Sequence, residues 1–222
     1  MRVKRVGLHV GAIFVLLALQ SRQSLADLYT YGFGRISDNG SVDVAYQLFV
    51  DVTNDGYGSD QAFFRFRNEG PVASSICDVY FDDFDDAEDR TLAGIAEIVN
   101  GPGVSFSQWA RPRNLSGGAA LSFYTTEGLS ADSDTPVATW GVNPGEWLGI
   151  VFDLQKDFSS VIGALNTGAA NPLRTDSLRI GIHVQGLPDD ESDLFVHAPV
   201  PGALLLGMLG LGAAGLRLRK HA

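Results

Sequence analysis

The feature that most constrains the fold is a run of eleven residues in which apolar and polar side chains alternate. From Val42 to Val52 every second residue is apolar or aromatic, and Asp43, Gln47 and Asp51 stand at positions between them. Successive side chains of a β-strand point to opposite faces, so this period of two predicts a strand with one buried and one solvated face. An amphipathic helix would instead repeat its apolar positions about every 3.6 residues.

Short segments elsewhere show the same period, with Gly, Pro, Asn and Asp-rich stretches between them. They are 62–67, 76–81, 104–107, 121–124, 147–154 and 178–185. The segment 91–99 fits helix or strand, and Gly94 and the following Gly-Pro-Gly favour strand. One short helix is expected after Asp157, a candidate N-cap. The pattern predicts an all-β fold, an antiparallel β-sandwich or jelly roll.

The N-terminus has the organisation of a cleavable export signal. Residues 1–26 begin with three basic residues, continue with an apolar run from Val6 to Leu19 and end in Ser24-Leu25-Ala26. This predicts a signal helix, cleavage by signal peptidase and a mature chain that begins at Asp27. An uncleaved membrane anchor is the alternative, although the apolar run is shorter than the roughly 20 residues that a full span requires.

The charge of residues 27–198 argues against nucleic acid as a partner. This segment holds all 26 acidic residues and nine of the 16 basic ones, a formal excess of 17 negative charges. Phosphate groups would be repelled, and no basic patch offsets the repulsion. The single cysteine, Cys77, alternates with Val79 and Phe81, so we expect it to be a buried core residue without a disulfide partner.

An acidic run after one predicted strand has two interpretations. The sequence "DVYFDDFDDAEDR" crowds carboxylates whose mutual repulsion a bound cation would relieve. On this interpretation calcium is the cofactor. The alternative is a solvated surface loop, since the run lacks a fixed spacing of ligands. The candidate metal ligands are Asp82, Asp83, Asp85 and Asp86.

The sequence contains no recognisable catalytic motif, so we assign no catalytic residue. G-x-S-x-G, H-E-x-x-H and phosphate-binding glycine loops do not occur. We expect His183 to point outward from its strand and His197 to have no partner. Carboxylates are abundant, so a glycosidase-like enzyme with paired carboxylates stays open as the alternative function. Trp109, in the loop "SQWARPRN", is expected to be exposed and is the candidate ligand-binding residue, with an indole face for sugar stacking.

The C-terminus combines a Pro-x-Pro cluster, an apolar segment and a basic end. The cluster is Pro199-Val200-Pro201-Gly202-Ala203, and the apolar segment runs from Ala203 to Leu216. Its 14 residues would form about 21 Å of helix, short of the roughly 30 Å of a bilayer core. Basic residues next to a transmembrane helix favour the cytoplasmic side and hold the precursor in the membrane. These residues are Arg217, Arg219 and Lys220.

This arrangement resembles the PEP-CTERM sorting signal of Gram-negative bacteria, with Val200 where that family usually has Glu. The resemblance implies an exosortase-like protease that cuts near Pro199 and Pro201, and a host that makes extracellular polysaccharide. The stretches 68–83, 103–118, 131–154 and 178–196 also resemble uncharacterised β-rich domains that carry such a tail.

These features predict three segments: a signal peptide at 1–26, a β-sandwich ectodomain at 27–198 and a sorting tail with a transmembrane helix at 199–222. We expect an inner-membrane precursor that moves to the cell surface or extracellular matrix. There it would serve a structural or binding role, with extracellular polysaccharide as a partner.

Overall fold

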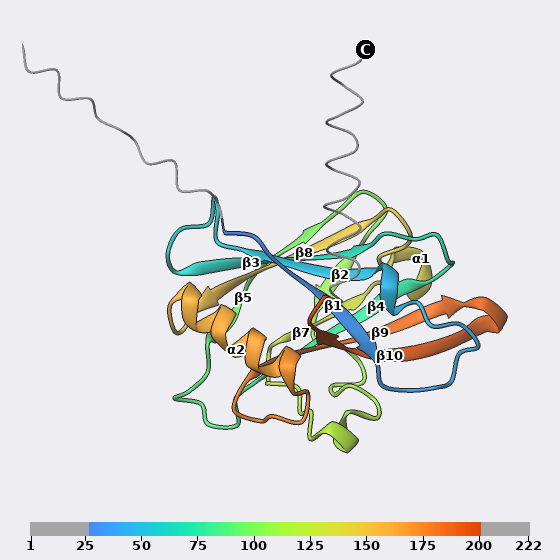
Figure 1. Cartoon of the computed structure of the whole chain (residues 1–222). Coiled ribbons are helices and arrows are strands. Elements are labelled where there is room, and N and C mark those ends of the chain that lie inside the picture. The colour runs from blue at the N-terminus through green and yellow to red at the C-terminus, as the bar shows by residue number, and fades with distance from the viewer. Residues whose placement is uncertain (1–26, 201–222) are drawn as a thin grey trace, which may run out of the picture.

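The structure is a computed structural model that describes residues 27–200, and these form a ten-stranded antiparallel sheet (Figure 1). The strand order is β5-β8-β3-β2-β1-β10-β9-β4-β7-β6. The strands are β1 (Tyr29–Arg35), β2 (Leu48–Thr53), β3 (Gln61–Asn68), β4 (Ser75–Asp83), β5 (Leu92–Asn100), β6 (Phe106–Gln108), β7 (Ser130–Ser133), β8 (Trp147–Leu154), β9 (Leu178–Leu187) and β10 (Glu191–Ala198). The helices are α1 (Val137–Trp140) and α2 (Phe158–Ala170), with 3₁₀ turns at Ala45–Gln47, Gly118–Leu121 and Pro188–Asp190.

Strand β1 joins the two halves of the sheet. Its first part, from Tyr29, pairs with β2, and its second part, from Gly32, pairs with β10. The halves face each other across the core, where the Phe81 ring lies 5.5 Å from that of Phe64 and 4.7 Å from that of Phe152. The sheet is nearly closed into a barrel.

Helix α2 covers part of the core because one side of it is apolar. Asp157 caps its N-terminus, accepting a hydrogen bond of 2.8 Å from the Ser160 backbone, as the sequence predicts. Val161 and Leu165 are fully buried in the same hydrophobic cluster as the facing strands. The helix lies beside β9 and β10, so it closes the core near the junction of the two halves (Figure 1).

The prediction of an antiparallel all-β fold is confirmed, and most predicted strands occur where the alternation places them. The finer architecture differs, because the two halves form one sheet continuous through β1 where a β-sandwich or jelly roll has two separate sheets. Cys77 is buried, as predicted. Among residues 27–200, no helix is long and apolar enough to span a membrane.

Two predicted strands differ from the structure. The strand expected from Val42 begins only at Leu48, after a 3₁₀ turn. Gln47, expected on the wet face, is buried, and its amide donates to Asn68 and Ser74 at 2.8 and 2.9 Å. The segment 121–124 begins with the last residue of a 3₁₀ turn and contains no strand. Its alternation reflects a loop that buries Phe123 against the sheet.

Candidate functional site

The segment from Trp109 to Leu129 is a long loop between the short strands β6 and β7. Its only regular element is the 3₁₀ turn at Gly118–Leu121. Loops of this length in compact domains are uncommon and usually functional. Leu115 and Phe123 of the loop pack against the sheet in a second hydrophobic cluster, which includes Tyr80 of β4.

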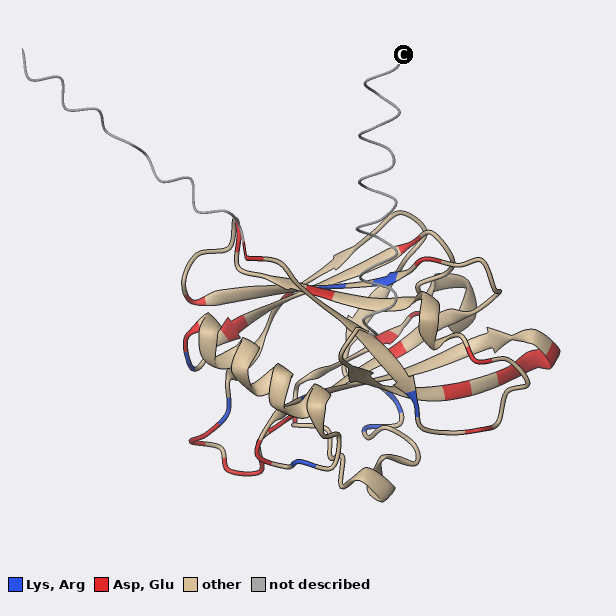
Figure 2. Ribbon diagram, viewed as in Figure 1, with Lys and Arg blue, Asp and Glu red and all other residues tan. Residues whose placement is uncertain are grey.

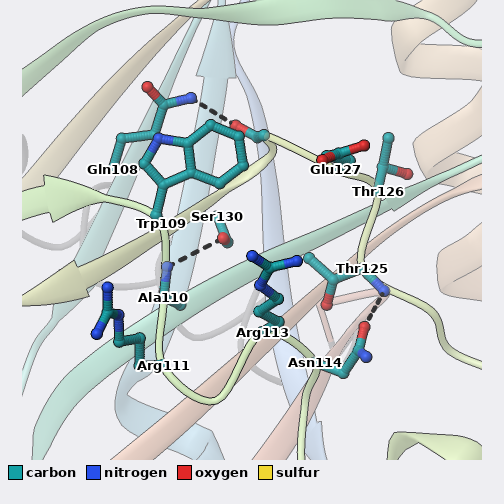
Figure 3. A pocket seen from close by; sticks show the side chains of 11 residues that line it. Gln108, Trp109, Ala110, Arg111, Arg113, Asn114, Thr125, Thr126, Glu127 and Ser130 are labelled. Carbon is teal, nitrogen blue, oxygen red and sulfur yellow. Dashed lines mark hydrogen bonds between the residues drawn. The ribbon is translucent and has the colours of Figure 1, made fainter.

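The two ends of this loop enclose a cleft of about 620 Å³ (Figure 3). Residues 108–114 form one wall, and residues 125–128 with Ser130 form the other. Ser130 connects the walls, because its carbonyl accepts from the Trp109 backbone at 2.9 Å and its hydroxyl accepts from Ala110 at 3.1 Å. The Gln108 amide donates to the Gly128 carbonyl at 2.7 Å. The cleft walls are therefore fixed to each other by hydrogen bonds.

Trp109 presents its indole ring at the cleft. The residue is 54% exposed, as the sequence predicts, and its backbone φ is +82°. This left-handed conformation is unfavourable for a bulky side chain and persists only where the surroundings enforce it. Such strain is typical of functional positions, where it fixes the direction of a side chain. Its role in ligand binding stays a prediction.

The charge of the cleft differs from that of the rest of the surface, where acidic residues are spread over many segments (Figure 2). Arg113 reaches between the two walls, and Arg111 lies on the Trp109 side (Figure 3). Within residues 27–200, no carboxylate forms an ion pair with either arginine. Glu127 is the one carboxylate among the described lining residues. The lining therefore has a formal excess of one positive charge.

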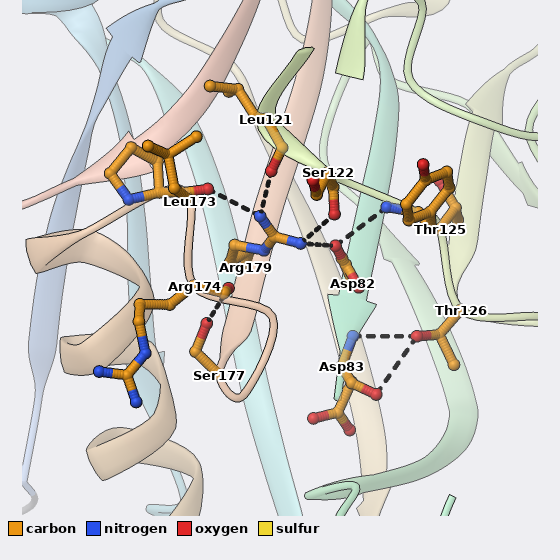
Figure 4. A network of polar contacts seen from close by, with 12 residues as sticks. Asp82, Asp83, Leu121, Ser122, Thr125, Thr126, Leu173, Arg174, Ser177 and Arg179 are labelled. Atoms are coloured by element: carbon orange, nitrogen blue, oxygen red, sulfur yellow. Dashed lines mark hydrogen bonds and ion pairs between the residues drawn. The ribbon is translucent and has the colours of Figure 1, made fainter. Parts of the chain in front are cut away.

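A buried ion pair supports the loop from below (Figure 4). Arg179 of β9 is fully buried and pairs with Asp82 of β4. The Arg179 guanidinium also donates to the carbonyls of Leu121 and Ser122, at 2.8 and 2.6 Å. Asp82 accepts from the Tyr124 backbone at 3.0 Å. Two oppositely charged side chains thereby fix the segment that leads into the second wall of the cleft.

The acidic run divides into buried and exposed parts. Asp83, like Asp82, is buried, and it accepts backbone hydrogen bonds of 2.8 and 2.7 Å from Thr91 and Leu92. Asp85 and Asp86 lie in the exposed loop that follows β4. In the part of the chain that the structure describes, no group of three or more potential metal-ligating side chains is placed to hold an ion. Asp82 and Asp83 instead stabilise the protein's own backbone and side chains.

Asp78 and Asp132 form a carboxyl pair that no spacing in the sequence indicates. These residues are directly opposite each other on β4 and β7. Burial, then the neighbouring Asp78 carboxylate, raise the pKa of Asp132 to about 7. Asp78 Oδ1 is buried without a hydrogen-bond partner among the described residues, and a proton on Asp132 would offer it one.

His183 lies on the other side of the same pair. Its Nδ1 is 2.8 Å from Asp78 Oδ2, and its side chain is 24% exposed. The three side chains form a row across β7, β4 and β9.

His197, expected to have no partner, is fully enclosed. It is 1% exposed, and its Nδ1 accepts from the Ile180 backbone at 3.0 Å. Its Nε2 lies 3.1 Å from the Leu165 carbonyl of α2. The expectation was wrong because the ring joins the helix to β9, a contact between segments distant in the sequence. Burial lowers the pKa of His197 to about 4, with the charge of Arg179 acting in the same direction.

The sorting residues lie at the limit of the described structure. Pro199 is exposed and Val200 is half-buried, directly after β10. The other tail positions lie outside the described residues: Pro201, Gly202, Ala203, Arg217, Arg219 and Lys220. No protein family, curated protein or solved structure matches the chain. The functional proposal therefore depends on the residues themselves.

Proposed function

We propose that the protein is an exported glycan-binding protein of the cell surface or extracellular matrix, which holds extracellular polysaccharide in the cleft beside Trp109. The observation that carries the proposal is the exposed indole on the wall of a concave, polar cleft. Aromatic faces suit sugars because a pyranose ring has an apolar face that covers the indole while its hydroxyls reach polar groups at the rim.

The surrounding side chains support binding more than catalysis. Asn114 supplies an amide group for hydrogen bonds with sugar hydroxyls. Glu127 is the one carboxylate in the described lining, whereas glycoside hydrolysis generally employs two that flank the bond. The cleft has the chemistry of a site that orients a sugar.

Export and sorting are proposed from the sequence of the two ends. Signal peptidase would release the chain at Asp27, and an exosortase-like protease would cut it near Pro201. Pro199 is exposed directly after β10, which leaves this residue accessible to a protease. Mass spectrometry of the surface protein from the producing cell is expected to find a C-terminus near Pro201. An intact tail through Ala222 would show a permanent anchor.

The binding function is tested with Trp109→Ala. Glycan-array binding of the purified full chain identifies a ligand, and titration then measures the loss in the variant. Removing a stacking indole is expected to weaken binding about tenfold or more. Trp140→Ala is the matched control, because Trp140 is 41% exposed but does not line the cleft. Equal losses in the two variants, or glycan binding that neither affects, would contradict a site at Trp109.

A carbohydrate-active enzyme is the second candidate, favoured by the carboxyl pair. Asp132, protonated up to about pH 7, has the form of a general acid at neutral pH. Release of reducing sugar ends from a bound polysaccharide, abolished by Asp132→Asn, would establish hydrolysis. Binding without release of sugar, unchanged in this variant, would exclude that role for the pair.

A further inference from the structure

We propose that the cleft selects sugars that carry a carboxylate, with the sugar ring on Trp109 and the carboxylate on Arg111 or Arg113. This inference rests on the proposed glycan-binding function and specifies its ligand as an acidic oligosaccharide built from uronic acid units. It starts from the position of two arginines in a strongly acidic domain.

Arg111 and Arg113 are two basic residues in a domain with a large excess of acidic ones. The described residues contain nine basic and 26 acidic side chains, yet Arg111 and Arg113, which both line the cleft, form no ion pair there. Arg67 pairs with Asp51 and Arg35 with Asp193, each at 2.6 Å, whereas Arg65 and Arg90, outside the cleft, also lack an ion pair among the described residues. A guanidinium group presents a planar set of donors that matches a carboxylate bidentately. Arg111 and Arg113 are therefore available for a ligand carboxylate.

Arg111 and Arg113 lie close to Trp109, whose indole ring would stack on the sugar. Arg111 and Trp109 are separated by Ala110 alone, and Ala110 is held by Ser130. Arg113 lies between the walls (Figure 3). A uronic acid carries its carboxylate at the edge of the ring, so the ring face and the charged edge can contact indole and guanidinium together. Glu127, on the opposite wall, is an acceptor for sugar hydroxyls.

The negative charge of the whole domain restricts which anions can bind in the cleft. An excess of 17 negative charges repels polyanions with doubly charged groups more than sugars with one charge per unit. At physiological ionic strength this repulsion is screened beyond about 8 Å, so the local arginines dominate inside the cleft. RNA, like a uronic acid oligomer, carries one negative charge per unit, so the fit of the ring and the carboxylate to the cleft, and not net charge, favours the sugar.

The test is calorimetric titration of the purified full chain with three matched pairs of oligosaccharides of equal length. They are galacturonate with galactose, glucuronate with glucose and mannuronate with mannose oligomers. At least one acidic member is expected to bind about tenfold or more tightly than its neutral partner, since hydrogen bonds to a charged group are the stronger ones. A single-stranded RNA oligomer is expected to bind more weakly, and tighter binding of RNA would overturn the proposal.

The variants separate this inference from the general glycan-binding function. Arg111→Gln with Arg113→Gln is expected to lower the affinity for the acidic member more than that for its neutral partner, so that the preference for the acid is lost. Arg65→Gln is the control, because Arg65 is exposed and lies beside Trp147, outside the cleft. Equal affinity for acidic and neutral members, lost in Trp109→Ala, would overturn carboxylate selection and leave glycan binding intact. Binding of none of the six would overturn both.

Discussion

Asp82 and Arg179 form an ion pair whose side chains are 5% and 0% exposed, beneath the loop that builds the cleft. Two charges in such a position stabilise the fold only while both are present, because either one alone would be buried without compensation. The pair also connects neighbouring strands to the carbonyls of Leu121 and Ser122. Stability and the shape of the cleft therefore depend on the same contacts.

Arg179→Met is expected to lower the free energy of unfolding by about 3–5 kcal/mol, because it leaves Asp82 buried without its partner. Urea denaturation measures the loss. The double variant Asp82→Leu, Arg179→Met is expected to recover part of it, since neither charge then remains.

The control for this prediction is Arg174→Met. Arg174 also forms an ion pair, with Asp176, but both side chains are largely exposed, so little stability depends on it. Similar denaturation midpoints for Arg174→Met and Arg179→Met would contradict the role of burial.

The stability of the protein is expected to depend on pH through His197. The pKa of His197 is about 4 in the folded protein and 6.5 in the unfolded chain, so the unfolded chain takes up the proton first as the pH falls. The stabilising contribution is complete above pH 6.5 and is lost between pH 6.5 and 4. It amounts to about 3 kcal/mol at most.

Urea denaturation of wild type and His197→Gln at several pH values checks this expectation. The stability difference between them should narrow from pH 7 to pH 4, because glutamine does not titrate. Val161→Ala, which changes a fully buried apolar residue, is the control. Its loss of unfolding free energy relative to wild type should not depend on pH. A constant difference for His197→Gln would contradict a neutral, buried imidazole.

Asp132→Asn should show the opposite dependence. The pKa of Asp132 is raised, so the folded protein retains a proton that the unfolded chain releases, and the contribution of this residue falls as the pH rises from about 4 to 7. Asparagine imitates the protonated acid and can donate to Asp78 Oδ1. The variant is therefore expected to be more stable than wild type at pH 8, measured as a higher melting temperature.

Asp134→Asn controls for the change in net charge. The Asp134 carboxylate accepts hydroxyl hydrogen bonds from Ser105 and Ser107 at 2.6 and 3.1 Å, so an amide offers no gain there. Equal stabilisation by both variants at pH 8 would show a general effect of charge and contradict the shared proton.

The sequence predicted those parts of the fold that depend on local pattern. Strand β3 alternates between buried and more exposed residues as its two faces require, and Asp157 marks the start of α2 because an N-cap acts within one turn. Strand β1 was not predicted, because glycines interrupt its alternation of apolar and polar side chains. Gln47 shows the limit of the pattern, since only its distant partners Asn68 and Ser74 make burial of its amide favourable.

The candidate site was less predictable because its walls come together through tertiary contacts. Trp109 was identified from its Arg and Pro-rich neighbours, whereas the opposite wall at 125–128 follows a loop whose course depends on Arg179. Asp78 and Asp132 meet only through the pairing of β4 with β7. Neither relation leaves a spacing signal in the sequence.

The turn "GVNPGE" allows a backbone effect to be measured without a packing effect. Glu146 N donates to the Asn143 carbonyl at 2.9 Å, and Gly145 has a φ of +87°, as in a type II turn with Pro144 and Gly145 at its centre. An added Cβ at Gly145 would meet no atom within 4 Å. Gly145→Val is therefore expected to destabilise the fold only because valine resists the positive φ at this position. The expected loss is about 1 kcal/mol or more.

Two further variants isolate this conformational term. Gly145→Asn is expected to cost less than Gly145→Val, because asparagine tolerates positive φ better than a β-branched residue does. Gly94→Val adds the same side chain on β5, where a Cβ also meets nothing within 4 Å but the backbone is extended. Valine favours strands, so this change should maintain or raise the denaturation midpoint. Equal midpoints for Gly145→Val and Gly94→Val would show that the positive φ at Gly145 does not limit stability.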